Sequence, residues 1–214
     1  MNRVLPILFN TDMVQAILDG RKTVTRRIVK KEKVEEVLNC SARKENPDIP
    51  DKRFIQCLVD APCDPGDILY VRETWNFVYN TDNSDQIIGN TGRYIYYADD
   101  PMPFSHWVDS DTGEHKERMP WKPSIHMPKE AARIWLKVTD VRVEQLQEID
   151  YKGAYDEGAG LKNTLYQIGE RVCDFAKIWN STIKKKDLPL YGWEANPWVW
   201  VIEFERCDKP EGID

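Results

Sequence analysis

The chain has 214 residues, of which 41% are hydrophobic, and it carries a formal net charge of -6. This length and apolar content are enough to bury a core, and they predict one domain, 1–214, with elaborations. The acidic balance argues against broad wrapping of duplex phosphate, because each neutralised phosphate generally needs a nearby cation. Its five cysteines include no Cys-x-x-Cys pair and are too few for a disulfide-stapled secreted scaffold, so reduced thiols and a cytoplasmic location are expected.

The N-terminal segment predicts a strand followed by a short helix. Residues 4–9 form an apolar run that is too short for a transmembrane helix, so we expect a first strand and no membrane partner. Asn10 and Thr11 are capping candidates for the helix that follows. Gly20 stands where a helix can end in left-handed backbone without a clash at Cβ.

A basic, hydroxyl-bearing cluster, residues 20–27, follows this helix directly. The β-branched run 23–29 predicts a strand, in which Thr25 and Arg27 share one face. Lys22 lies three residues before Thr25, so the two meet only if the turn after Gly20 redirects the lysine side chain. The alternative is a helix end followed by a solvated edge strand.

Positive charge is concentrated in two places despite the acidic total. Between residues 21 and 33 only Glu32 interrupts a basic run that consists of Arg21, Lys22, Arg26, Arg27, Lys30, Lys31 and Lys33. A second, shorter run is 184–186. A single-stranded or nucleoside ligand could use such a patch without making the protein basic overall. The alternative for both runs is solvated surface charge.

A turn at residues 64–67 introduces a predicted strand over 68–75. Leu69, Val71, Glu73 and Trp75 fall on one face of it, which places a carboxylate at the end of an apolar row. A buried carboxylate needs a cation or hydroxyl partner, for which Lys22, Arg27 and Thr25 are candidates. The alternative is a rim glutamate paired structurally with an arginine.

Further along the chain we expect a short strand at 54–59, an exposed loop at 80–92, a strand at 94–97 and an irregular excursion at 101–120. Lys122, Ser124 and His126 alternate and predict a polar row on one strand face. Near the C-terminal end the expected elements are a strand over 133–143 that changes parity near Thr139, a helix with an apolar stripe formed by Leu165, Ile168, Val172, Phe175 and Trp179, and a strand over 198–204 that is covered on both faces.

Four segments, in this order, resemble the ASCH domain family, whose relatives include the PUA RNA-binding fold. They are the residues Gly20, Lys22, Thr25 and Arg27; Pro65-Gly66-Asp67 with Arg72-Glu73-Thr74-Trp75; 121–128; and 196–204. The last two segments look like motifs of the longer phage and prophage members. The resemblance implies an α+β fold with a small PUA-like β-barrel flanked by helices, in which 76–120 is an inserted loop and strand excursion. It also implies RNA or a modified nucleoside as partner.

One bacterial branch of that family hydrolyses acetylcytidine, and by motif position its Lys, Thr and Glu fall on Lys22, Thr25 and Glu73. A threonine hydroxyl is a poor nucleophile until a base takes its proton. Lys22 could be that base only when neutral, and Glu73 could instead carry the proton to the leaving amine. The residues do not choose between these roles. A second reading is a non-catalytic RNA or modified-base binding module.

Further substrate-binding candidates adjoin these motifs: Arg21, Arg26, Arg27, Trp75, Trp121, Lys122, Ser124 and His126. The tryptophans could stack on a base, although packing is the commoner use of such rings. His106, His115 and His126 lack compact metal-ligand spacing, so the sequence predicts neither a metal nor another cofactor. A ribonuclease is the weaker alternative, because neither a metal-binding carboxylate cluster nor a convincing histidine pair is evident. The sequence leaves the oligomeric state open.

Overall fold

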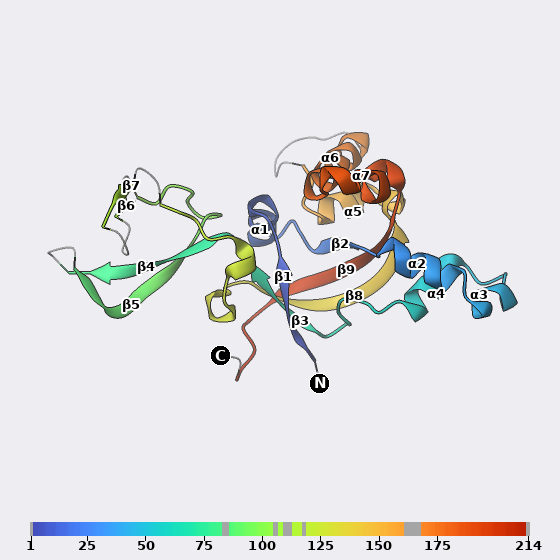
Figure 1. Cartoon of the computed structure of the whole chain (residues 1–214), viewed down its shortest axis with the longest axis horizontal. Helices are drawn as coiled ribbons and strands as arrows, with labels where there is room; N and C mark the ends of the chain where they lie inside the picture. The colour runs from blue at the N-terminus through green and yellow to red at the C-terminus, as the bar shows by residue number, and fades with distance from the viewer. Residues whose placement is uncertain are drawn as a thin grey trace. The chain divides into compact units, whose positions relative to one another are not determined.

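The structure, a computed structural model, describes residues 2–82, 86–104, 107–108, 113–116, 119–160 and 168–212, and it is an α+β protein (Figure 1). The chain divides into two compact units, and each is described by itself. The first comprises the described parts of Met1–Leu5, Ala16–Ile68 and Leu136–Arg206, and the second those of Pro6–Gln15, Leu69–Trp135 and Cys207–Asp214.

A five-stranded sheet has the order β1-β3-β8-β9-β2. Its strands are β1 (Val4–Leu8), β2 (Val24–Ile28), β3 (Ile68–Arg72), β8 (Trp135–Gln145) and β9 (Trp198–Cys207). Two further pairs are β4 (Trp75–Thr81) with β5 (Ile87–Tyr96), and β6 (Trp107–Val108) with β7 (His115–Lys116).

The α-helices are α1 (Thr11–Leu18), α2 (Lys31–Leu38), α3 (Ser41–Glu45), α4 (Asp51–Leu58), α5 (Tyr151–Asp156), α6 (Ile168–Thr182) and α7 (Leu188–Tyr191). Short 3-10 turns are η1 (Ser124–His126), η2 (Lys129–Ala131), η3 (Leu146–Glu148), η4 (Lys185–Asp187) and η5 (Trp193–Ala195). No helix among the described residues is long and apolar enough to cross a membrane.

The helix before the basic cluster forms as predicted. The Asn10 side chain accepts a hydrogen bond from the backbone N–H of Met13 at 2.9 Å and so caps α1. Gly20 has φ +73°, the left-handed backbone that ends a helix most easily when no Cβ is present. The chain then enters β2, which fixes where the cluster's side chains point.

In the first unit, β2 pairs with β9 antiparallel, so that Thr25 lies opposite Ile202 and Arg27 opposite Trp200. Val24 and its β9 neighbours Val199 and Val201 are buried against Phe175 and Trp179 of α6. Figure 1 shows α5, α6 and α7 gathered along this side of the strands. Because side chains alternate in a strand, Thr25 and Arg27 leave β2 on the face opposite this helical layer.

Several predicted elements are confirmed. Leu69, Val71, Glu73 and Trp75 are all buried, although β3 ends at Arg72 and β4 begins at Trp75. In β8 the buried parity changes from Leu136 and Val138 to Val141 and Val143, as expected. The strand predicted at 198–204 is β9, and the predicted apolar stripe falls on α6, except that Leu165 lies outside the described residues.

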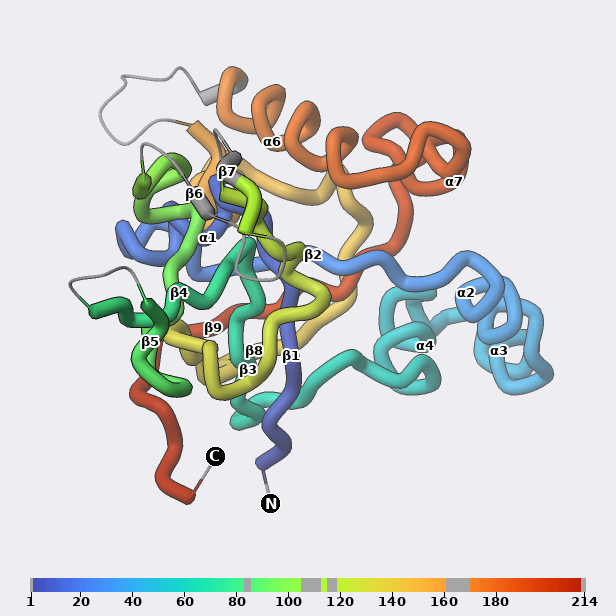
Figure 2. Tube along the Cα trace, turned by 60° about the vertical axis from the view of Figure 1, so that its left-hand side comes forward, coloured from blue at the N-terminus to red at the C-terminus, as the bar shows by residue number. Residues whose placement is uncertain are grey.

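The strand predicted at 54–59 is wrong, because this segment belongs to helix α4. Phe54 and Ile55 are buried while Leu58, one turn on, is exposed. The helix packs against α2, and both tube and cartoon views show α2, α3 and α4 as one group (Figure 2). Spacing of apolar residues at i, i+1 and i+4 suits a helix face, and this period prevails over the local β-propensity of Phe and Ile.

The segment predicted as an exposed loop at 80–92 is exposed in its described part, but the loop assignment is wrong, because residues 80–81 belong to β4 and residues 87–92 to its antiparallel partner β5. Ladder hydrogen bonding tolerates the low strand propensity of Asn and Gly here. Gly92 is required by close packing, since a Cβ there would lie 2.6 Å from the Phe77 ring. Within the irregular excursion predicted at 101–120, the described residues include the β6–β7 pair.

The polar strand row of Lys122, Ser124 and His126 does not form. Ser124 and His126 belong to the 3-10 turn η1, whereas Lys122 makes an isolated backbone bridge to Trp75. Pro123 and Pro128 flank the turn. Proline has no N–H for a strand ladder, so the backbone turns between them instead of continuing extended.

Candidate functional site

Lys22 is a fully buried cation in the first unit, at the start of β2. Its ammonium donates hydrogen bonds to the carbonyls of Val24 at 2.7 Å and Glu157 at 3.0 Å, and to Oε2 of Glu157 at 2.5 Å. Three acceptors match the three N–H donors of an ammonium. Burial lowers the pKa of Lys22, and the neighbouring Glu157 carboxylate acts in the opposite direction by raising it.

A glycine lets the chain close over this lysine. Gly158 follows Glu157 with φ +88°, and a Cβ at this position would lie 2.8 Å from the Cβ of Ala16 and 3.5 Å from that of Lys22. A side chain would therefore be strained both by the backbone conformation and by the lack of space. The turn after α5 thus presents the Glu157 carboxylate to the buried ammonium at close range.

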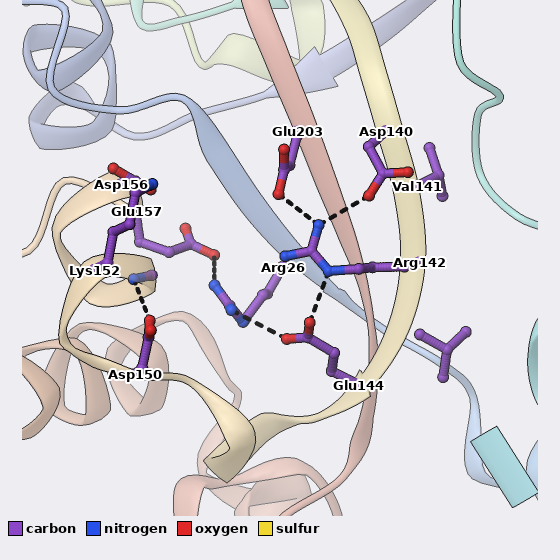
Figure 3. Close-up of polar contacts among 12 residues, drawn as sticks. Arg26, Asp140, Val141, Arg142, Glu144, Asp150, Lys152, Asp156, Glu157 and Glu203 are labelled. Carbon is purple, nitrogen blue, oxygen red and sulfur yellow. Dashed lines mark hydrogen bonds and ion pairs between the residues drawn. The ribbon is translucent and has the colours of Figure 1, made fainter. Parts of the chain in front are cut away.

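Glu157 belongs to a chain of alternating charges, which Figure 3 shows from Glu157 through Arg26 to Arg142. Its Oε1 pairs with Arg26 at 3.2 Å, and Arg26 reaches Glu144 at 3.3 Å. Glu144 pairs in turn with Arg142 at 2.7 Å, which also contacts Asp140 and Glu203. We call these residues the ionic chain: Lys22, Glu157, Arg26, Glu144, Arg142, Asp140 and Glu203. Its inner members are almost completely buried.

Thr25, the predicted nucleophile, is 3% exposed and leaves β2 on the face opposite Arg26. The structure thus brings Lys22 and Arg26 together on one carboxylate, while Thr25 shares its face with Arg27. Burial lowers the pKa of Arg27, with Glu157 opposing that effect, although an arginine stays charged at neutral pH.

Glu73, the third predicted catalytic residue, lies in the second unit and has an arginine partner that the sequence interpretation did not name. Arg133 donates to both carboxylate oxygens, at 2.9 and 3.0 Å, and to both oxygens of Asp99. Its guanidinium also lies over the Tyr96 ring, 4.0 Å from the centroid. Burial raises the pKa of Glu73, and Arg133 opposes this by lowering it.

Replacing Arg133 with Met should therefore destabilise the protein in a pH-dependent way. We expect the free energy of unfolding to fall by about 2–3 kcal/mol at pH 7, less than for a fully buried pair because solvent reaches part of Arg133. Without Arg133 the pKa of Glu73 in the folded protein rises further above its value in the unfolded chain. Protonated Glu73 then favours the folded state at low pH, and the free energy of unfolding falls as pH rises through the folded-state pKa.

Urea unfolding at pH 4.5 and pH 7 measures this effect, with Asp99→Asn as the control because Asp99 is half exposed. The loss caused by Arg133→Met should be smaller at pH 4.5. Glu73→Gln in the Arg133→Met background should recover part of the loss at pH 7. An equal loss at both pH values would mean that Arg133 acts through packing and not through the Glu73 charge.

The comparisons with known proteins give one distant likeness. The sequence matches no family model and no curated protein. The fold is similar to the crystal structure of protein EF3133 from Enterococcus faecalis V583, of family DUF984, with 11% sequence identity, 97% of this chain and 77% of that chain covered, and a TM-score of 0.39. At this TM-score the likeness bears on neither the family nor the function of this chain.

The remaining predicted substrate-binding residues are held by structural contacts. Arg21 donates to the carbonyls of Gly158 at 3.1 Å and Gly160 at 3.4 Å, close to the Lys22 site. In the second unit Trp75 is buried, with the Lys122 ammonium 5.0 Å from the ring centroid. Trp121 donates to the Pro101 carbonyl. These contacts leave their predicted role in ligand binding untested.

Ser124 is half-buried and His126 is exposed on the η1 turn. His106 and the side chain of His115 lie outside the described part of the chain. Across the described residues, no group of three His, Cys, Asp or Glu side chains is placed to hold a metal ion. The residues that sequence reasoning missed are Glu157, Glu144 and Arg133. Only Arg133 had a signal in the sequence, because it is a single charged residue in an otherwise apolar stretch.

Proposed function

We propose that this chain binds RNA or a modified nucleoside and hydrolyses an amide on a modified cytidine. Thr25 is the candidate nucleophile that attacks the amide carbon. Lys22, once its proton has passed to Glu157 and it is neutral, and Glu73 are the candidate groups that take the hydroxyl proton and protonate the leaving amine. The acyl group then rests on Thr25 as an ester until water releases it. The PUA-like barrel and membership of the ASCH family are part of this proposal and rest on the sequence motifs.

One observation carries the proposal: the three nominated residues are all buried, and the two titratable ones have pKa values displaced toward each other. Burial lowers the pKa of Lys22 and raises that of Glu73. A base must lose its proton near neutral pH and an acid must keep one, so these directions suit general acid–base chemistry. Perturbed pKa values of this kind concentrate at functional sites, although structural ion pairs produce them too.

The second candidate is a non-catalytic reader of RNA or a modified base. It is favoured by the pairing of each charge, since Lys22 donates to three acceptors and Glu73 accepts from Arg133 through both oxygens. Such satisfied pairs also occur where a buried charge only stabilises the fold. A cytoplasmic location and a phage or prophage origin remain predictions from the sequence.

Turnover and binding measured side by side separate the two candidates. A panel of modified nucleosides that includes acetylcytidine is incubated with the protein, and mass spectrometry follows loss of the acyl group. Equilibrium titration of the same panel gives affinities. Deacylation supports the hydrolase, whereas binding of a panel member without turnover supports the reader. Neither turnover nor binding across the panel would overturn both.

A further inference from the structure

A cavity of about 290 Å³ lies on the Thr25 and Arg27 side of β2, entirely within the first unit. Its wall combines the end of β2, helix α2 and the segment after α4, and the residues that matter here are Arg27, Lys30, Lys33, Leu58, Asp60 and Trp200. Small-molecule pockets usually run from about 300 Å³ upward, so this volume suits one small ligand.

The charges of this cavity favour an anion. Arg27 contributes a permanently charged guanidinium from the strand, whereas Lys30 and Lys33 stand at the beginning of α2. Among the residues that line the cavity, three are cationic and one, Asp60, is a carboxylate, while the Glu157 carboxylate also acts on Arg27. Lys33 also pairs with Glu36 at 2.9 Å, but both side chains are more than half exposed, and such a pair holds its partners weakly.

The same cavity has an apolar and aromatic side. Trp200 lies directly opposite Arg27 in the β2–β9 pair and lines the wall, with only 4% of its surface exposed. Leu58, the last residue of α4, lines it too and is 54% exposed. A flat apolar group placed there would remove that surface from water. Inorganic phosphate alone would leave it uncovered.

We propose that this cavity binds a nucleotide, with the phosphate against Arg27, Lys30 and Lys33 and the base against Leu58 and the exposed edge of Trp200. Aromatic rings and aliphatic side chains take up the flat base, and Lys and Arg neutralise the phosphate. The nucleotide is a free monophosphate or one residue of a single-stranded RNA, since both present the same groups. The inference rests on the cavity and stands whether or not the chain hydrolyses an amide.

Titration of the full chain with cytidine 5′-monophosphate, cytidine and inorganic phosphate tests this site. The monophosphate should bind at least about tenfold more tightly than either part alone. The double variant Lys30→Ala/Lys33→Ala should lower the affinity for the monophosphate by about tenfold or more, whereas Lys31→Ala should change this affinity less than about twofold. Lys31 is the matched control, because it lies between the two lysines and does not line the cavity.

Leu58→Ser tests the apolar side at an exposed position where folding should tolerate the change. This variant should lower the affinity for cytidine 5′-monophosphate and leave the affinity for inorganic phosphate unchanged. A short single-stranded RNA is titrated in parallel. If it binds more tightly than the monophosphate, and if the Lys30→Ala/Lys33→Ala variant loses affinity for both, the natural ligand is RNA. If it binds equally or more weakly, the natural ligand is the free nucleotide. Monophosphate binding no tighter than that of phosphate, or an equal loss in Lys31→Ala, would overturn the inference.

Discussion

Replacing Glu157 with Gln should lower the free energy of unfolding by about 3–5 kcal/mol at neutral pH, the usual cost of breaking a buried ion pair from one side. The substitution keeps the side-chain volume but removes the charge that faces the Lys22 ammonium and the Arg26 guanidinium. Arg26 retains Glu144 as a second partner, so the larger share of the loss should come from Lys22.

The pH dependence of this variant follows from Lys22. Loss of Glu157 removes an influence that raises the lysine's pKa, so burial lowers that pKa further. The unfolded chain then binds the proton more tightly than the folded one, and the stability of the variant should rise with pH as the buried lysine becomes neutral. The difference in free energy of unfolding between the parent and Glu157→Gln should therefore become smaller at alkaline pH.

Urea unfolding of the parent, Glu157→Gln and Asp156→Asn measures the stability loss. Asp156 is the adjacent carboxylate, and its pair with Lys152 is largely exposed on the lysine side, so we expect a loss within about 1 kcal/mol. Lys22→Met in the Glu157→Gln background should restore part of the stability, since no unpaired ammonium remains buried. Equal losses in Glu157→Gln and Asp156→Asn would show that the ionic chain does not stabilise the fold.

The second large effect is expected at Thr25, the proposed nucleophile. Thr25→Val preserves the shape of a side chain that is 3% exposed but removes its hydroxyl, so turnover should fall by at least about 10³-fold while ligand affinity changes little. Thr25→Ser, which keeps a hydroxyl, should retain measurable turnover. Thr23→Val is the control, because Thr23 immediately precedes β2 and is exposed.

Single-turnover experiments with acetylcytidine, or with whichever panel member is deacylated, separate the acylation of Thr25 from ester hydrolysis. Parent protein mixed with substrate should accumulate an acylated species that mass spectrometry assigns to Thr25. If Thr25→Val and Thr23→Val keep the same turnover, Thr25 is not the nucleophile. If the Thr25 variants lose affinity in proportion to turnover, the hydroxyl recognises the ligand instead.

Sequence reasoning succeeded where the deciding interactions are local. The end of α1 at Gly20 and the parity change in β8 are both set by neighbours within a few residues, through backbone conformation and side-chain alternation. Helix α4 was missed because a short apolar segment suits either period. Its amphipathic face became evident only through packing against α2.

The sequence nominated residues for the candidate site but not the partners that these residues have in the fold. Lys22, Thr25 and Glu73 are all buried, and their catalytic role stays a prediction. Glu157 lies 135 residues from Lys22, and Arg133 lies 60 residues from Glu73. Only the folded chain brings such distant residues together. A single sequence contains no local pattern that pairs a particular glutamate with a particular lysine at that separation.

The two consecutive arginines of β2 serve opposite faces, Arg26 in the ionic chain and Arg27 at the cavity. A slip of one residue between β2 and β9 would exchange them, because every side chain of the strand would change face. In the observed register, in which Thr25 lies opposite Ile202, the two arginines keep to separate faces. Deletion of one residue between Gly20 and Val24 would thus alter the segment that positions Lys22. Insertion of one residue within β2 before Arg26 would instead turn Arg26 toward the cavity and Arg27 toward the ionic chain.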